Sequence, residues 1–397
     1  MRSVSFGVGG LAVTVLAVVL AACGGEEAKP QPVVPTPPVA TTPPPVVEAP
    51  KEEPKPAPTM AELQKQTGMG IGQAINAHDA KKVASFYTEN AVIKMAGAPA
   101  DITGREAIAA MWQKNFDAVS NAKSMASKIY AKGDVVVVEF AWAGTHSGDM
   151  MGVKATEKPV GVQGVDVMWF SPDGLVKEQH TYLDMGTIMS QIGASKQKAR
   201  AVPTIPTTPP VVVVSTNSAD EQKNVDAATK MFAAFEKKNA DDFMGGASDD
   251  ITWDDLTQPE AMKGKAAGKK YFAAMTTAFP DVKSTTTNAW GIGDVVIAEG
   301  TLSGTQKGAF FGIPATKKAI NLHGLDIMTF KDGKIVSGRS YGNGAELMSQ
   351  LGLLPQPGAA KDAKPAAKAD AKGAPAGKTD AKPTTAPATP AAAPAKK

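Results

Sequence analysis

The 397-residue chain contains one sequence twice, and this internal repeat restricts its fold more than any other feature. The tetrapeptide GDVV at 133–136 returns at 293–296, and further matches at the same spacing of 160 residues lie on both sides of it. After Pro172 the spacing falls by one residue, so that DG at 173–174 matches DG at 332–333. A register this long with a single slip indicates duplication of a domain, because similar composition alone would not preserve the spacing.

The repeats define two domains, at 60–195 and 217–355, each of a size that folds autonomously in other proteins. A Pro- and Val-containing linker at 196–216 separates them, and its run of valines at 211–214 could add a short edge strand. A duplicated chain can pair its two domains with each other, or it can form a homodimer, and the sequence leaves both arrangements open.

The N-terminus has the pattern of a secretory signal peptide at 1–22, with Arg2 followed by an apolar run from Val8 to Leu20. That run is too short for a committed membrane span. It ends in LAAC, which resembles the lipobox of bacterial lipoproteins, and Cys23 is the only cysteine of the chain. The resemblance implies acylation of Cys23 and attachment to a membrane. Gly24 after it implies the outer membrane, with the protein periplasmic or surface-exposed.

Two further segments are dominated by Pro, Ala and charged residues and do not have the aromatic content of a packed core. Residues 23–59 are expected to form an extended tether. Residues 356–397 form an Ala/Pro/Lys tail, which is either a solvated, disordered segment or a contact for anionic polymers of the envelope. The formal net charge of the whole chain is only +3, which argues against binding to nucleic acid.

Each domain begins with helical periodicity and ends with strand periodicity. In the first domain, Ile71, Ala74 and Ile75 share one helical face, and Asp79 can cap a second short helix that carries Val83, Phe86 and Tyr87. A third helix is predicted over 103–116. The segments 135–148, 158–170 and 174–184 then alternate with a period of two, as strands do. Helices followed by antiparallel strands predict an α+β fold.

Two matching segments, GTHSGDMMGVKATEK at 144–158 and GTQKGAFFGIPATKK at 304–318, resemble a signature of SnoaL-like polyketide cyclases, or ester cyclases. These enzymes belong to the nuclear transport factor 2-like superfamily. The resemblance covers both domains and implies two tandem cones, each a curved antiparallel sheet over about three helices. It also implies a pocket for a small apolar ligand, and catalysis without a metal or cofactor.

The last predicted strand of the first domain, KEQHTYLD at 177–184, places Glu178, His180, Tyr182 and Asp184 on one face. The resemblance implies that a carboxylate near the end of this strand removes a proton α to a carbonyl, and Asp184 matches best. His180 and His146 would assist it. Asp184 can equally be the N-cap of the next helix, since Asn343 stands at the same place in the second domain.

The ligand-binding positions that follow from this interpretation lie on the predicted strands of both domains. They are Tyr182, Trp142 and Asp166 in the first domain and Tyr341, Arg339 and Asp326 in the second. The four histidines of the chain do not have metal-ligand spacing. Two functions remain open: a cofactor-independent cyclase or isomerase acting on a small apolar carbonyl compound, and a non-catalytic module that binds a small ligand or another envelope protein.

Overall fold

The computed structural model describes residues 58–354. The signal peptide, Cys23, nearly all of the tether and the C-terminal tail therefore lie outside the described residues. None of the helices within 58–354 has the length and apolarity needed to cross a membrane.

The first domain combines four helices with a sheet of six of its own strands. Its helix α1 begins at a capping box, in which Thr59 Oγ1 accepts a hydrogen bond from the Glu62 N–H and the Glu62 carboxylate accepts one from the Thr59 N–H. The elements in chain order are α1 (Met60–Asn76), α2 (Ala80–Ala84), β1 (Tyr87–Met95), β2 (Ile102–Thr103), α3 (Arg105–Ala118), β3 (Lys123–Lys132), β4 (Val135–Thr145), β5 (Pro159–Phe170), β6 (Val176–Leu183) and α4 (Met185–Ile192).

The sheet has the order β2-β1-β6-β5-β4-β3-β7, where β7 (Val211–Val214) is the valine run of the linker, paired in parallel with β3. Strands β3 to β6 are antiparallel neighbours, and β1 runs parallel to β6. Phe86 and Tyr87 were predicted to continue the second helix, but α2 ends at Ala84 and Tyr87 starts β1. The reason is that the sequence from Tyr87 onward forms a half-buried strand between β2 and β6, which overrides a short helical pattern.

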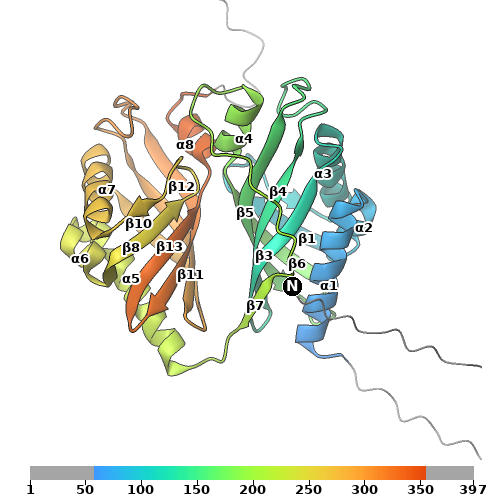
Figure 1. Cartoon of the computed structure of the whole chain (residues 1–397), viewed down its shortest axis with the longest axis horizontal. Coiled ribbons are helices and arrows are strands. Elements are labelled where there is room, and N and C mark those ends of the chain that lie inside the picture. The colour runs from blue at the N-terminus through green and yellow to red at the C-terminus, as the bar shows by residue number, and fades with distance from the viewer. Residues whose placement is uncertain (1–57, 355–397) are drawn as a thin grey trace, which may run out of the picture. The chain divides into compact units, whose positions relative to one another are not determined.

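The second domain, drawn in Figure 1, repeats this plan, and its strand order is β10-β11-β12-β13-β8-β9. Its elements are α5 (Ala219–Lys237), α6 (Ala240–Gly245), β8 (Ala247–Asp255), β9 (Met262–Lys263), α7 (Lys265–Ala278), β10 (Lys283–Ile292), β11 (Val295–Thr305), β12 (Ala319–Lys331), β13 (Lys334–Tyr341) and α8 (Gly344–Gln350). The predicted α+β fold of two tandem domains is confirmed.

Both faces of each sheet are buried. In the first domain one face packs on α1, α2 and α3, through residues such as Val83, Ile108 and Val136. The opposite faces of the two sheets share a second core, which includes Val137 and Val165 from the first domain and Ile297, Leu325 and Ile327 from the second. The two domains are thus paired with each other within the chain.

Candidate functional site

Each domain encloses a cavity on the helical side of its sheet. The cavity of the first domain has a volume of about 560 Å³ and lies between the sheet and helices α3 and α4. Most of its lining is apolar: Ile93, Met95, Met111, Trp112, Phe140, Trp142, Val162, Leu183, Met185 and Ile188. Such a lining suits a small apolar ligand, because it presents few polar groups that would have to give up hydrogen bonds to water when the ligand binds.

Asp166 on β5 places a carboxyl group in this cavity. Its Oδ1 accepts hydrogen bonds from Thr181 Oγ1 at 2.7 Å and from Gln179 Nε2 at 3.0 Å, both on the neighbouring strand β6. Burial raises the pKa of Asp166 to about 6, although these two hydrogen bonds act in the opposite direction. Asp166 is therefore poised to take up or release a proton near neutral pH.

Trp112 on α3 lines the same cavity, and its indole N–H is buried without a hydrogen-bond partner among the residues that the structure describes. A buried donor without an acceptor is costly, so such groups are rare unless a ligand or a water molecule satisfies them. The first cavity thus combines a half-buried carboxyl group, an unpaired N–H donor and apolar walls. Two other lining carboxylates, Asp117 and Asp149, belong to exposed or half-exposed side chains at its rim.

Strand β6 turns its two polar faces in opposite directions. Gln179, Thr181 and Leu183 line the cavity, whereas His180 and Tyr182 face the second domain. The prediction that the face carrying His180 and Tyr182 lines the cavity is therefore wrong. The error arose because both faces of the sheet are buried. Polar side chains that have hydrogen-bond partners can therefore lie on either face, and their presence does not identify the face of the cavity.

The two outward-facing side chains of β6 bind a buried glutamate of the other domain. Glu299 on β11 is 2% exposed, and its carboxylate contacts His180 Nδ1 at 2.8 Å and accepts from the Tyr182 hydroxyl at 2.9 Å. Asn288 Nδ2 donates to its second oxygen at 2.9 Å. Burial acts to lower the pKa of His180, but the hydrogen bond and charge of Glu299 outweigh it and raise that pKa.

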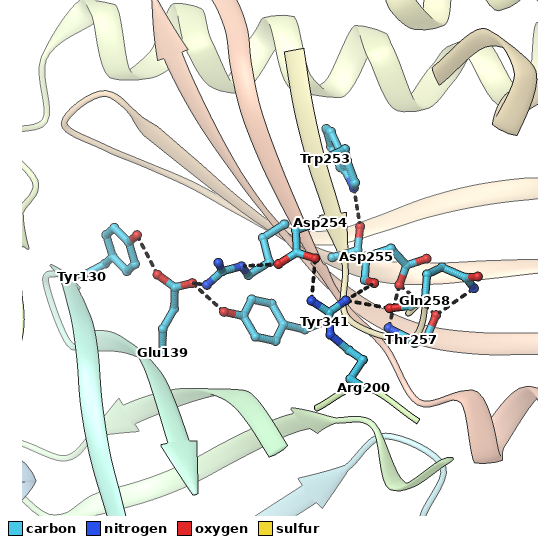
Figure 2. A network of polar contacts seen from close by, with 11 residues as sticks. Tyr130, Glu139, Arg200, Trp253, Asp254, Asp255, Thr257, Gln258 and Tyr341 are labelled. Carbon is cyan, nitrogen blue, oxygen red and sulfur yellow. Dashed lines mark hydrogen bonds and ion pairs between the residues drawn. The ribbon is translucent and has the colours of Figure 1, made fainter. Parts of the chain in front are cut away.

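The equivalent glutamate of the first domain, Glu139 on β4, is 3% exposed and binds side chains of β13. Tyr130 donates to it from β3, and from the second domain the Tyr341 hydroxyl and Arg339 Nη1 donate to it. Figure 2 shows this network, which continues through Asp254 to Arg200 of the linker. Tyr341 and Arg339, predicted to bind a ligand, thus bind the first domain instead, because their strand face is the one shared by the two sheets.

Asp184 lies at the contact between two helix N-termini and is 4% exposed. Its carboxylate accepts from the Gly186 N–H and the Thr187 N–H of α4, both at 3.0 Å, and from the Gly344 N–H of α8 at 2.8 Å. Asn343 does the converse, accepting from the N–H groups of Ala345 and Met185. Asp184 is absent from the lining of the cavity, so the structure shows the cap and gives the predicted base no geometric support.

His146 is fully buried and holds the loop between β4 and β5. Its Nδ1 lies 2.9 Å from Thr156 Oγ1, and its backbone groups bond to Thr156, Glu157 and Lys158. Gln306 makes the corresponding contact with Thr316 in the second domain. His146 does not line the cavity, so the structure assigns it to holding this loop and does not support its predicted catalytic role.

Three of the predicted ligand-binding positions line a cavity, whereas most of the other lining residues, including Trp112, Gln179 and Thr181, were not predicted. Trp142 and Asp166 line the first cavity as predicted positions, and Asp326 lines a second cavity of about 210 Å³ in the second domain. Trp112 falls within the helix predicted over 103–116 but was not singled out as a site residue, and Gln179 and Thr181 were passed over. The sequence did carry a sign of Gln179 and Thr181, since strand alternation places both polar residues on the face of β6 opposite His180 and Tyr182. Within 58–354, no group of three or more His, Cys, Asp or Glu side chains is placed to hold a metal ion.

The comparison with protein families finds the same two-domain division. The family model described as "SnoaL-like polyketide cyclase" matches residues 70–192 and 225–351. Among solved structures, a protein designated a SnoaL-like polyketide cyclase from Jannaschia sp. CCS1 is 19% identical, with a TM-score of 0.33, over 36% of this chain and 99% of its own.

Two Streptomyces structures are also similar. AclR from Streptomyces galilaeus, designated a hydroxylase, is 24% identical over 34% of this chain and 89% of its own, with a TM-score of 0.32. IdmH from Streptomyces antibioticus, designated a polyketide cyclase, is 25% identical over 33% of this chain and 98% of its own, with a TM-score of 0.30. A comparison with curated proteins found no match. With the family pattern matched in both halves, the chain belongs to the SnoaL-like polyketide cyclase family and carries two of its domains in tandem.

Proposed function

We propose that the first domain binds a small apolar carbonyl compound in its cavity and that Asp166 exchanges a proton with it. The observation that supports this most is the position of Asp166, a carboxyl group in an apolar cavity with a pKa near 6. A carboxylate that has lost part of its hydration is a stronger base than one in water. This proposal moves the catalytic role from Asp184 to Asp166.

The chemistry needs no reactant beyond the substrate. The Asp166 carboxylate takes a proton from the carbon next to the carbonyl, and the electron pair of that C–H bond moves onto the carbonyl oxygen. The unpaired N–H of Trp112 would donate to the resulting enolate oxygen, which stabilises the charge that develops there. The protonated Asp166 then returns its proton at another atom, which gives an isomer. Alternatively, the enolate carbon attacks a second carbonyl of the same molecule and closes a ring, and the alkoxide formed there takes the proton back from Asp166.

A second candidate is a carrier that binds the same class of compound without turnover. The two neutral donors on Asp166, Thr181 and Gln179, favour it, because a carboxyl group held in this way also serves as a fixed acceptor for a ligand hydroxyl. For either function we propose a place at the outer membrane, held by a lipid on Cys23. Labelling of cells with a palmitate analogue should mark the protein and leave its Cys23→Ser variant unlabelled.

Nitrobenzisoxazole tests the proton transfer, since loss of one C–H proton opens its ring and releases a coloured phenolate. The full-length protein in detergent should accelerate this reaction, with a rate that rises through about pH 6. Asp166→Asn should abolish the acceleration, and Trp112→Phe should reduce it roughly tenfold.

Asp149→Asn is the matched control, because Asp149 lines the same cavity but pairs with Lys154, which lowers its pKa and makes it a weaker base. Its rate should equal that of the wild type. If Asp166→Asn kept the acceleration and Asp184→Asn lost it, Asp184 and not Asp166 would be the base. Saturable quenching of tryptophan fluorescence by the probe without any turnover would support the carrier.

A further inference from the structure

The cavity of the second domain differs from the first in size and in charge. It has a volume of about 210 Å³ and lies between the sheet and helices α5, α6 and α7. Its walls are rich in aromatic rings, namely Phe232, Phe235, Phe243, Trp253 and Tyr271. Aromatic faces attract both apolar groups and organic cations.

Three acidic residues line this small cavity, Asp255, Asp326 and Glu299, and the Glu299 carboxylate is already bound by His180, Tyr182 and Asn288. Asp326 on β12 accepts a hydrogen bond from Ser340 Oγ, and Asp255 at the end of β8 accepts from the N–H and the hydroxyl of Thr257 at 2.9 and 2.8 Å. Burial raises the pKa of both, that of Asp326 to about 7 with a further contribution from the charge of Asp255. Ser340 on β13 pairs in register with Asp326 on one side and with Asp255 on the other, so Asp255 and Asp326 stand two strands apart across one residue.

The third polar group is the hydroxyl of Tyr271, which lies on α7 and lines the same cavity. Burial raises the pKa of Tyr271, and the charges of Asp255 and Asp326 raise it further, so its hydroxyl lies within electrostatic reach of both carboxylates.

Positive charge is scarce around these groups. Among residues 58–354, the lining of the second cavity contains no Lys or Arg, and its one base, His323, is paired with Glu346 at 2.8 Å. Arg200 lowers the pKa of Asp255 by its charge, but its guanidinium forms an ion pair with Asp254 and hydrogen-bonds to backbone carbonyls. Asp255 and Asp326 therefore have no Lys or Arg partner among the described residues that line the cavity.

The first domain shows that the fold does not require this arrangement. At the matching positions of the repeat, Asp255 corresponds to Met95 and Tyr271 corresponds to Met111, and both methionines line the first cavity. Of Asp255, Tyr271 and Asp326, only Asp326 has a polar counterpart in the first domain, which is Asp166. The added carboxylate and hydroxyl are therefore features of the second cavity alone, and they change the ligand that it suits.

We propose that the second cavity is a separate binding site for a small organic cation, an amine that carries an apolar group. The ammonium would lie between Asp255 and Asp326 and donate a hydrogen bond to the Tyr271 hydroxyl, while the apolar group packs against the aromatic walls. A charge-assisted hydrogen bond in a site shielded from water is stronger than a neutral one. This site does not depend on the function proposed for the first cavity.

Three ligands of matched shape test the proposal: benzylammonium, benzyl alcohol and benzoate. Calorimetry on the full-length protein in detergent should show binding of benzylammonium, much weaker binding of benzyl alcohol, and none of benzoate. Asp326→Asn and Tyr271→Met should each weaken benzylammonium binding, Asp326→Asn by roughly tenfold to a hundredfold. Circular dichroism on both variants would establish that they fold.

Asp166→Asn is the matched control, since it removes the equivalent carboxylate from the first cavity and should leave benzylammonium binding unchanged. Equal affinity for benzyl alcohol and benzylammonium would overturn the proposal. So would unchanged binding in folded Asp326→Asn, or an equal loss in Asp166→Asn, which would place the cation in the first cavity.

Discussion

Replacement of Asp184 by alanine should destabilise the protein more than loss of an ordinary helix cap. The Asp184 carboxylate accepts from two N–H groups of α4 and one of α8, and it is almost completely buried. Loss of an N-cap costs about 1 kcal/mol. A buried N–H left without a partner, here that of Gly344, costs about 1–3 kcal/mol more. We therefore expect Asp184→Ala to lower the free energy of unfolding by about 3 kcal/mol.

Asp184→Asn should cost only about 1 kcal/mol, because one oxygen remains to accept from α8 while the amide opposes a single N–H. Urea unfolding followed by circular dichroism measures both changes. Asp79→Ala is the control, since Asp79 caps α2 through one hydrogen bond at an exposed position and should cost at most about 1 kcal/mol. A loss in Asp184→Ala no larger than that in Asp79→Ala would refute the shared cap.

Three further predictions concern titratable groups. The folded pKa of Asp166 lies above its ordinary value of 3.8, so its carboxyl favours folding below that value and loses this contribution as the pH rises through about 6. Asp166→Asn should therefore be more stable than the wild type by about 2 kcal/mol at about pH 8 and similar to it at about pH 4, as measured by urea unfolding. The folded pKa of His180 is raised by Glu299, so its pairing stabilises the protein at low pH and weakens as the pH rises through that raised pKa. His180→Gln should remove this part of the dependence of the melting temperature on pH, and an unchanged profile would contradict the assignment. His146→Gln should change the unfolding free energy by less than about 1 kcal/mol, because Gln306 holds the same loop in the second domain, and a larger loss would show that the ring is required.

The repeat and the change of periodicity were enough to predict the fold. A register over most of both domains reports on shared tertiary structure, and helical spacing followed by alternation is specific to an α+β layer arrangement. Assignment of the faces of β6 was beyond this reasoning. Gln179 and Thr181 are as polar as His180 and Tyr182, and only the pairing of the domains decides which row meets the cavity.

The position of Asp184 shows the same limit from another side. Comparison with Asn343 correctly indicated a helix cap, because both residues place an oxygen one residue before a helix. That each cap also serves the other helix depends on contacts between the domains, on which local sequence carries no information. Trp112 was missed because an indole at helical spacing looks like packing, and its unpaired N–H becomes visible only in three dimensions.

The pairing of duplicated sheets within one chain has a consequence that a dimer of identical chains does not share. In such a dimer every substitution occurs twice, so the two halves of the interface must remain alike. Here His180 and Arg339 occupy matching positions of the repeat, and each meets the buried glutamate of the opposite domain. One half of the interface is thus held by an imidazole whose pKa is raised by Glu299 and whose charge depends on pH, and the other by a guanidinium that stays charged. Because the two domains belong to one chain, their interface can differ between its two halves. The half that contains His180 depends on pH, and the half that contains Arg339 does not.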